Sequence, residues 1–381
     1  MHATIIQNHL NSSTKPKVAT SSMLDKSSVD ELQTASRQTA SLANELGHLH
    51  GFDYLRVFFM MMVLLGHTNF FWHMADSREQ VIGAGPNVWD FLSFGVQSTA
   101  VPSFILMSML LVSLRQSTWQ NTVERVKKLA YLYGFWVTAW VYYSKSKPEQ
   151  SVFGWIEFVL SGGGWLFYTF ASLIILTPFC WVASKLTRRG QWVALMISIG
   201  VVAGSFVWVR VGFKWVYHPY FWLPTCFAMM PFAAAILVPH LKRFRESAAA
   251  RYKWVAIMLV LGIIAAILEW KFSAHREVLV GERRFVPKHA RLSIQFTAVA
   301  WLLLSLGIRR PANRVITFFA RNSLGIYCIH PFLLRAVMIP MRKIGDPISP
   351  ELTILATCAV LAVTCSLVSE FLRKAFKQRL I

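Results

Sequence analysis

The sequence contains few charged residues. Only 15% of its 381 residues are Asp, Glu, Lys or Arg, whereas a soluble globular domain has about 25%. This deficit excludes an ordinary soluble enzyme. Hydrophobic residues make up 55% of the chain, including 28 Phe and 15 Trp, and the mean hydropathy is +0.45. One soluble core cannot bury so many apolar side chains, so many of them must face lipid.

The sequence also lacks disulfide, metal and secretion motifs. The cysteines lie in apolar stretches without a CxxC pair, which predicts small core residues rather than disulfides or zinc ligands. No spacing of His, Asp and Glu indicates a metal site. Residues 1–48 are rich in Ser, Thr and Gln and have no apolar run of seven or more, which predicts a disordered tail without a cleavable signal peptide. The five cysteines are Cys180, Cys226, Cys328, Cys358 and Cys365.

Long apolar segments dominate what is present. A membrane-spanning helix needs about 20 mainly apolar residues, and ten segments come near that length. We find no repeat of 20 to 50 residues and no second hydrophilic domain. The sequence therefore predicts an all-α polytopic membrane protein with about ten transmembrane helices: a cytoplasmic tail (1–48), a membrane domain (49–372) and a basic cytoplasmic tail (373–381). The ten segments are 57–74, 93–114, 129–143, 165–184, 191–209, 221–240, 254–270, 292–308, 316–339 and 352–369.

Basic residues in the loops predict the orientation. The loop 115–128 and every second loop after it carry 19 Lys and Arg in total. The other loops, beginning with 75–92, carry 13, of which six lie in 271–291. Because short basic loops stay in the cytoplasm, both termini are expected there. The formal charge of +21 then comes mostly from the basic cytoplasmic loops that set the membrane orientation, and it does not indicate nucleic-acid binding. Segment 271–291 has two interpretations: an outer loop that binds an anionic or glycan substrate, or an inner loop after a miscounted helix.

The first apolar segment carries ionisable residues, which are costly in a membrane and often functional. Arg56 and His67 are eleven residues apart, so on a helix they share a face to within about 20° and lie about 16 Å apart. An arginine at the cytoplasmic surface can hold a phosphate while a deeper histidine transfers protons. The alternatives are an interfacial anchor for Arg56 and a hydrogen-bonded core histidine for His67. Asp53 either pairs with Arg56 or positions the same ligand.

Other polar residues in apolar segments also have two interpretations. Ser108 serves helix packing or a site. Arg125 and Lys128 are three apart, so they share a helical face and either grip phosphates or extend to lipid headgroups. Three glycines before Trp165 predict a hinge or a flexible connection. His330, which precedes a proline, is typical of a helix break.

Five short motifs, in order, resemble the acyltransferase-3 family of integral membrane O-acyltransferases, which includes enzymes that acetylate bacterial surface polysaccharides. The resemblance covers most of residues 51–335. Two positions depart from the family pattern: Met109 stands where glycine is usual, and Lys128 replaces an arginine. The matching residues are Arg56 and His67 (Arg-x10-His), Pro102, Phe104 and Ser108, Arg125 with Lys128, Trp165, Tyr168 and Pro178, and Ser323, Tyr327 and His330.

The resemblance implies acyl-CoA, usually acetyl-CoA, as the donor and a sugar hydroxyl as the acceptor, with no bound cofactor. It makes His67 and Arg56 the expected catalytic residues. The protein is expected to be a multi-pass protein of the bacterial inner membrane, and it is expected to work alone or with a polysaccharide assembly system. The alternative is a transporter or flippase for a lipid-linked or anionic glycan. The residues expected to bind substrate or donor are Asp53, Ser108, Arg125, Lys128, Trp165, Tyr327 and His330.

Overall fold

The computed structural model describes residues 45–68, 70, 92–115, 118–145, 151–165, 167–211, 223–277, 289–345 and 349–376. The chain divides into two units, Met1–Gln38 and Thr39–Ile381, and the first lies outside the described residues. Within these ranges every regular element is a helix, so the all-α prediction is confirmed. Of the tail 1–48 that was predicted to be disordered, residues 1–44 fall outside the described part, as do the last five residues, 377–381. Residues 45–48 are described, and the Leu46 side chain is buried.

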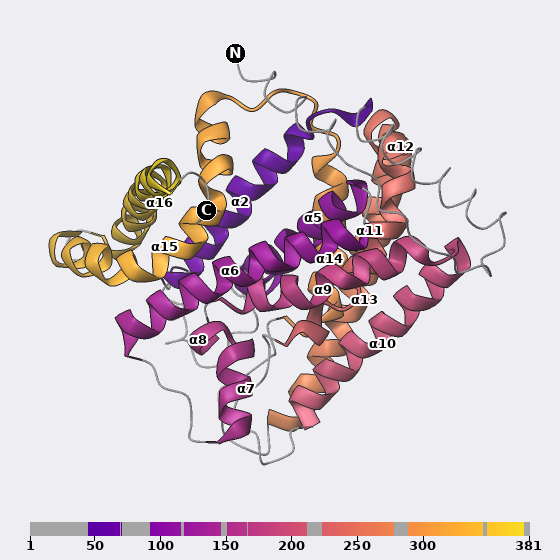
Figure 1. Cartoon of the computed structure of the whole chain (residues 1–381), viewed down its shortest axis with the longest axis horizontal. Helices are drawn as coiled ribbons and strands as arrows, with labels where there is room; N and C mark the ends of the chain where they lie inside the picture. The colour runs from indigo at the N-terminus through magenta and orange to yellow at the C-terminus, as the bar shows by residue number, and fades with distance from the viewer. Residues whose placement is uncertain are drawn as a thin grey trace, which may run out of the picture. The chain divides into compact units, whose positions relative to one another are not determined.

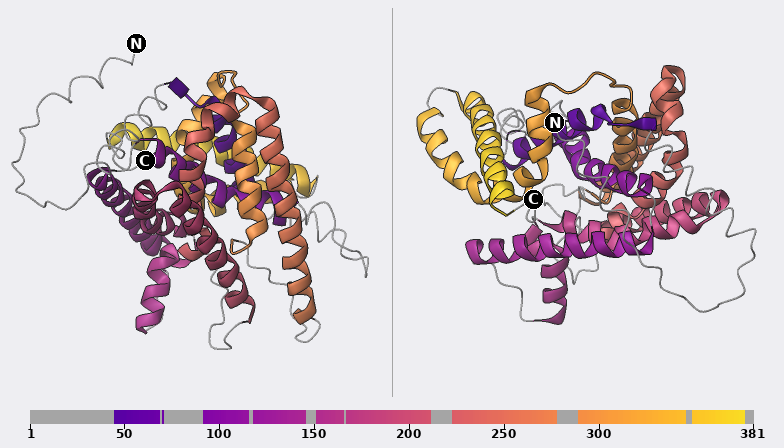
Figure 2. Two further views of the ribbon diagram at one scale, coloured as in Figure 1. Left: turned by 90° about the vertical axis from the view of Figure 1, so that its right-hand side faces the viewer. Right: turned by 45° about the horizontal axis from the view of Figure 1, so that its top comes forward.

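Each of the ten predicted segments contains helix. The bounds are α2 His50–His67, η2 Leu92–Val96, η3 Gln97–Thr99, α5 Ala100–Leu114, α6 Trp119–Ser144, α7 Val152–Leu160, α8 Gly162–Trp165, α9 Tyr168–Lys185, α10 Arg188–Val211, η4 Pro224–Phe227, α11 Met230–Leu237, η5 Val238–His240, α12 Leu241–Glu246, α13 Ala248–Glu277, α14 Leu292–Ser305, α15 Arg314–Gly345 and α16 Pro350–Ala375 (Figure 1). The short helix α7 was not among the predicted segments. It projects away from its neighbours in every view (Figure 2).

Seven helical stretches of the described chain are long and apolar enough to cross a membrane. They confirm a multi-pass membrane protein. The other three predicted spans correspond to α2, α6 and α14. Polar residues at both ends of α2 and in the first turns of α6 lower the hydropathy of these helices, and α14 has only 14 residues. The number ten and the cytoplasmic placement of both termini stay predictions.

Helix α6 begins ten residues before the predicted start at 129. The Thr118 side chain accepts a hydrogen bond from the backbone N–H of Asn121, 3.1 Å away, and so satisfies one of the free donors at the helix start. A hydropathy search misses this start because the first turns of α6 are polar. As a result, Arg125 and Lys128 lie within a helix and not in a loop.

Helix α2 lies in the centre of the packing. It contacts α5, α14, α15 and α16 and contributes to two apolar clusters. Phe59 belongs to the cluster built mainly with α5, α11 and α14, and Leu64 belongs to the cluster built with α6, α15 and α16. The tertiary structure therefore holds both ends of α2.

The five cysteines of the chain are free and buried, as predicted.

Helix α15 is bent. Its 32 residues extend for about 48 Å at 1.5 Å per residue, and the helix changes direction along its length (Figure 1). Pro331 and Pro340 lie inside it, where each lacks an N–H and crowds the preceding turn. The break expected at His330 is thus not observed, because the helix continues through His330 and both prolines.

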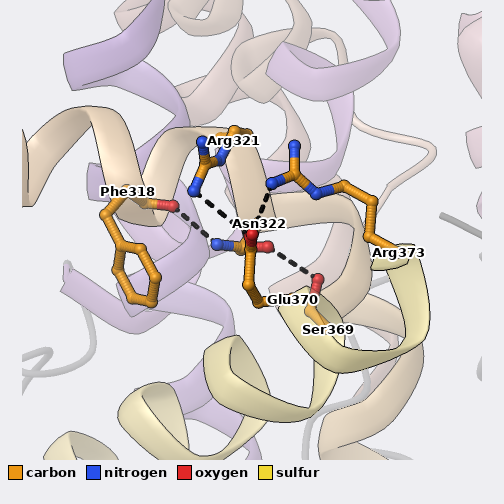
Figure 3. Close-up of polar contacts among 6 residues, drawn as sticks. All are labelled: Phe318, Arg321, Asn322, Ser369, Glu370 and Arg373. Atoms are coloured by element: carbon orange, nitrogen blue, oxygen red, sulfur yellow. Dashed lines mark hydrogen bonds and ion pairs between the residues drawn. The ribbon is translucent and has the colours of Figure 1, made fainter. Parts of the chain in front are cut away.

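A polar clamp joins α15 to α16 (Figure 3). The Asn322 side chain is fully buried; it donates to a carbonyl of its own helix at 3.0 Å and accepts from Ser369 Oγ at 2.9 Å. Glu370 forms ion pairs with Arg321 at 3.2 Å and Arg373 at 2.6 Å. The buried hydrogen bonds fix the register of the two helices, because an unpaired amide in the core costs about 1–3 kcal/mol.

The close approach of α2 to α14 gives a stability prediction. A Cβ added at Gly51 would lie 1.7 Å from the Ser305 carbonyl oxygen, whereas a Cβ at Gly134 in α6 would meet nothing within 4 Å. We expect Gly51→Ala to destabilise the protein by about 1–3 kcal/mol and Gly134→Ala to be neutral or stabilising. Thermal unfolding in detergent measures the stability of both variants. Equal melting temperatures of Gly51→Ala and Gly134→Ala would contradict the close contact.

Candidate active site

The first polar group lies at the start of α2. The Asp53 carboxylate is buried, accepts a hydrogen bond from His48 Nε2 at 2.6 Å, and forms an ion pair with Arg56 at 3.6 Å. His50 lies beside them, and the ligand atoms of the two histidines and Asp53 are all within 4.8 Å of one another. The Arg56 side chain is about one third exposed, and one nitrogen of its guanidinium faces Asp53. The two histidines were missed by the sequence analysis.

The second polar group lies at the other end of α2. The rings of His67 and His330, 263 residues apart in the chain, have centroids 4.9 Å apart. His67 is exposed, whereas His330 is 1% exposed. His330 Nδ1–H donates to the Ile326 carbonyl at 3.1 Å, which leaves Nε2 as the acceptor atom. Among the described residues, that Nε2 has no hydrogen-bond partner.

Helix α9 adds hydroxyl groups beside this histidine pair. The Tyr327 ring lies 6.2 Å from His330, and its hydroxyl donates to Thr169 at 3.1 Å. The residue before Thr169 is Tyr168, whose hydroxyl forms a hydrogen bond with His289 Nε2 at 2.8 Å. Buried polar groups thus follow one another from α15 through α9 to the residues before α14. Thr169 and His289 were missed by the sequence analysis. Thr169 is a polar residue in an apolar segment, which is the signal that finds it, whereas His289 lies in the basic segment 271–291 and no such signal indicates it.

A third group joins α5 to α6. Arg125 Nη2 donates to Ser108 Oγ at 2.7 Å, although the two residues are 17 apart in the sequence. Among the described contacts, none joins Arg125 to Arg56 or to Lys128. The Lys128 side chain is exposed. No described contact supports the binding of one phosphate by Arg125 and Lys128 together. The hydrogen bond of Arg125 to Ser108 links α6 to α5.

The glycine-rich segment before Trp165 forms a turn. Gly162 and Gly163 have φ of +73° and +77°, a conformation that favours glycine. A Cβ at Gly162 would also lie 2.4 Å from the backbone of Phe167. The expected hinge is therefore a tight turn between α7 and α9. Trp165 ends α8 within this turn, and its side chain lies outside the described part of the structure.

The basic segment 271–291 is only partly described. Its last residue, Arg291, is 9% exposed. Burial lowers the pKa of the Arg291 guanidinium, and the neighbouring Glu269 carboxylate partly offsets this by raising it. Arg291 therefore has an internal counter-charge and is not a free cation for an outside ligand. Residues 278–288, which include Arg283, fall outside the described ranges, so both interpretations of the loop stay open.

The described helices and these groups define a multi-pass membrane protein with ionisable residues at both ends of a central helix. A family profile described as an acyltransferase domain matches residues 49–370, and the chain belongs to this family. It is accordingly a membrane acyltransferase. Comparisons with curated proteins and with solved structures give no match.

Replacing His330 tests whether its ring positions His67. His330→Phe keeps a ring but removes the acceptor, and we expect kcat to fall about 100-fold, because a misplacement near 1 Å costs that much. His330→Gln returns an acceptor close to the Nε2 position and should recover part of kcat. The KM for acyl-CoA should change little in both. Acyl transfer by purified protein measures these values, and equal activity of the two variants would contradict the positioning role.

Proposed function

We propose that this acyltransferase transfers an acetyl group from acetyl-CoA to a hydroxyl of a surface or secreted polysaccharide, or of its lipid-linked precursor. The observation that carries the proposal is the pair of His67 and His330, whose rings are 4.9 Å apart, at the opposite end of α2 from Arg56. Eleven residues of helix separate Arg56 from His67 by about 16 Å. This separation suits a long donor with an anionic end and a reactive thioester.

Arg56 is the proposed partner for the donor phosphates. A guanidinium presents several N–H donors in a fixed plane, which matches phosphate oxygens. Its contact with Asp53 is an ion pair at 3.6 Å, longer than a strong hydrogen bond, so donor groups of Arg56 remain available. Asp53 holds the side chain near the start of α2, and Arg125 lies on another helix as a second cation.

His67 is the proposed catalytic base. In its neutral form it takes the proton from the acceptor hydroxyl as that oxygen attacks the thioester carbonyl carbon. The carbon–sulfur bond then breaks, and the proton passes to the CoA thiolate, so the products are the ester and free CoA. A histidine with a pKa near 6.5 suits proton transfer at neutral pH. Covalent transfer of the acyl group through His67 gives the same products and is the alternative route.

The location of His67 favours access from two sides. A residue about 16 Å into the membrane lies near the middle of a hydrocarbon core about 30 Å thick. With both termini in the cytoplasm of a bacterial inner membrane, the donor would enter at Arg56 and the acceptor from the opposite face. A polysaccharide assembly system would then supply the acceptor.

The Arg56 role predicts a change in donor affinity. Arg56→Lys keeps the charge but loses the planar donor set, so we expect the KM for acetyl-CoA to rise about tenfold, equivalent to roughly one charged hydrogen bond. The matched control is Arg321→Lys, whose arginine pairs with Glu370 on the clamp and should leave KM unchanged. A KM that stays the same in Arg56→Lys would remove Arg56 from donor binding.

The decisive experiment compares surface and secreted glycans by mass spectrometry in cells that express wild type, His67→Ala or His240→Ala at equal levels. We expect ester-linked acetyl groups to disappear in His67→Ala and to remain in His240→Ala, a histidine on η5 that contacts Arg188. Release of free CoA by purified protein should follow the same pattern. Unchanged acetylation with altered glycan export would instead favour a transporter or flippase.

A further inference from the structure

The start of α2 carries two histidines, beside Asp53, that the proposed acyl transfer does not use. His48 lies two residues before α2 begins, His50 is the first residue of α2, and Asp53 lies in its first turn. One ligand atom from each lies within 4.8 Å of the other two. Around a tetrahedral zinc ion with bonds of 2.0–2.2 Å, ligand atoms lie about 3.4 Å apart. Small side-chain rotations therefore bring the three residues to coordination distance.

The chemistry of the three residues selects a class of metal. Two imidazoles and one carboxylate suit zinc and similar transition metals, whereas magnesium and calcium prefer oxygen ligands. His48 is 62% exposed on its side chain and Asp53 only 10%, so the cluster is open on the histidine side and closed on the carboxylate side. A metal ion can enter from solvent. With three protein ligands, its fourth coordination position remains for water.

The two oxygens of Asp53 face different partners. Oδ2 is 2.6 Å from His48 Nε2, and Oδ1 is 3.6 Å from Arg56. A metal ion replaces the proton shared between His48 and Oδ2, while Arg56 stays beside Oδ1. Carboxylates that bind metals are usually held from behind by a second group. In this cluster Arg56 is that group, so it supports the ligand and does not occupy the metal position.

The segment that carries His48 is tethered to α12. Glu45 forms an ion pair with Lys242 at 2.8 Å, and Arg245 donates to the Leu46 carbonyl. Gly47 then turns the chain with φ of +56°, a conformation that favours glycine. These contacts hold His48 over the first turn of α2 in the absence of a ligand, which lowers the entropy cost of binding.

We propose that His48, His50 and Asp53 form a binding site for one zinc-class divalent ion at the start of α2, separate from the histidine pair at its other end. The site does not depend on the proposed acyl transfer, because its formation is measured by binding alone.

The test uses the full chain in detergent, purified through a tag without histidine and stripped of metal. The sequence has 11 histidines, so the measured quantity is the difference between variants. Zinc chloride titrated by calorimetry should show one more equivalent in wild type than in His48→Ala/His50→Ala. The affinity at this site should fall by at least the roughly 100-fold that loss of a supporting group costs. Magnesium chloride should give no such site.

The control His240→Ala removes a histidine outside the cluster and should keep the full zinc equivalent. Zinc should raise the melting temperature of wild type and His240→Ala but not of the double variant, because a ligand stabilises only the fold that binds it. Equal melting temperatures without zinc show that the double variant folds. Identical zinc stoichiometry and affinity in wild type and the double variant, or no binding in wild type, would overturn the proposal.

Discussion

The cost of placing polar groups in an apolar environment governs this structure. A polar side chain without a partner in the membrane costs free energy, and several buried side chains of the described helices reduce that cost by pairing across helices. Ser108 pairs with Arg125, Asn322 with Ser369, and Tyr327 with Thr169. The first two pairs join consecutive helices, and the third joins α15 to α9, 158 residues away in the sequence. The same interactions therefore satisfy polar groups and fix the arrangement of the bundle.

Helix α2 combines this constraint with function. Its middle is apolar and contributes to two clusters of the core, while its polar residues lie at the two ends. The contact of Gly51 with Ser305 holds one end against α14, and the ring contact with His330 lies at the other. A rigid helix then keeps a cation and a histidine at a fixed separation, on which the proposed binding of a long donor depends.

The continuity of α15 is the second structural condition for the site. Pro331 follows His330 directly and lies inside a helix of 32 residues. The helix packs on α16 through Asn322, and His330 lies against His67 of α2. The proline does not end the helix, so both contacts come from one continuous element.

The sequence by itself determined the all-α membrane class, the buried cysteines and the position of most helices, because hydropathy acts over 20 residues at a time and needs no tertiary contact. It also determined that Arg56 and His67 share a helix face, since their spacing follows from helix geometry. The polar start of α6 and the separate helix α7 were missed, because capping and chain turns carry little hydropathy signal. Only the tertiary structure decided which residues meet. Periodicity within one segment holds no information about a partner 263 residues away, such as His330 for His67, nor about the turn at Gly47 that places His48 beside Asp53.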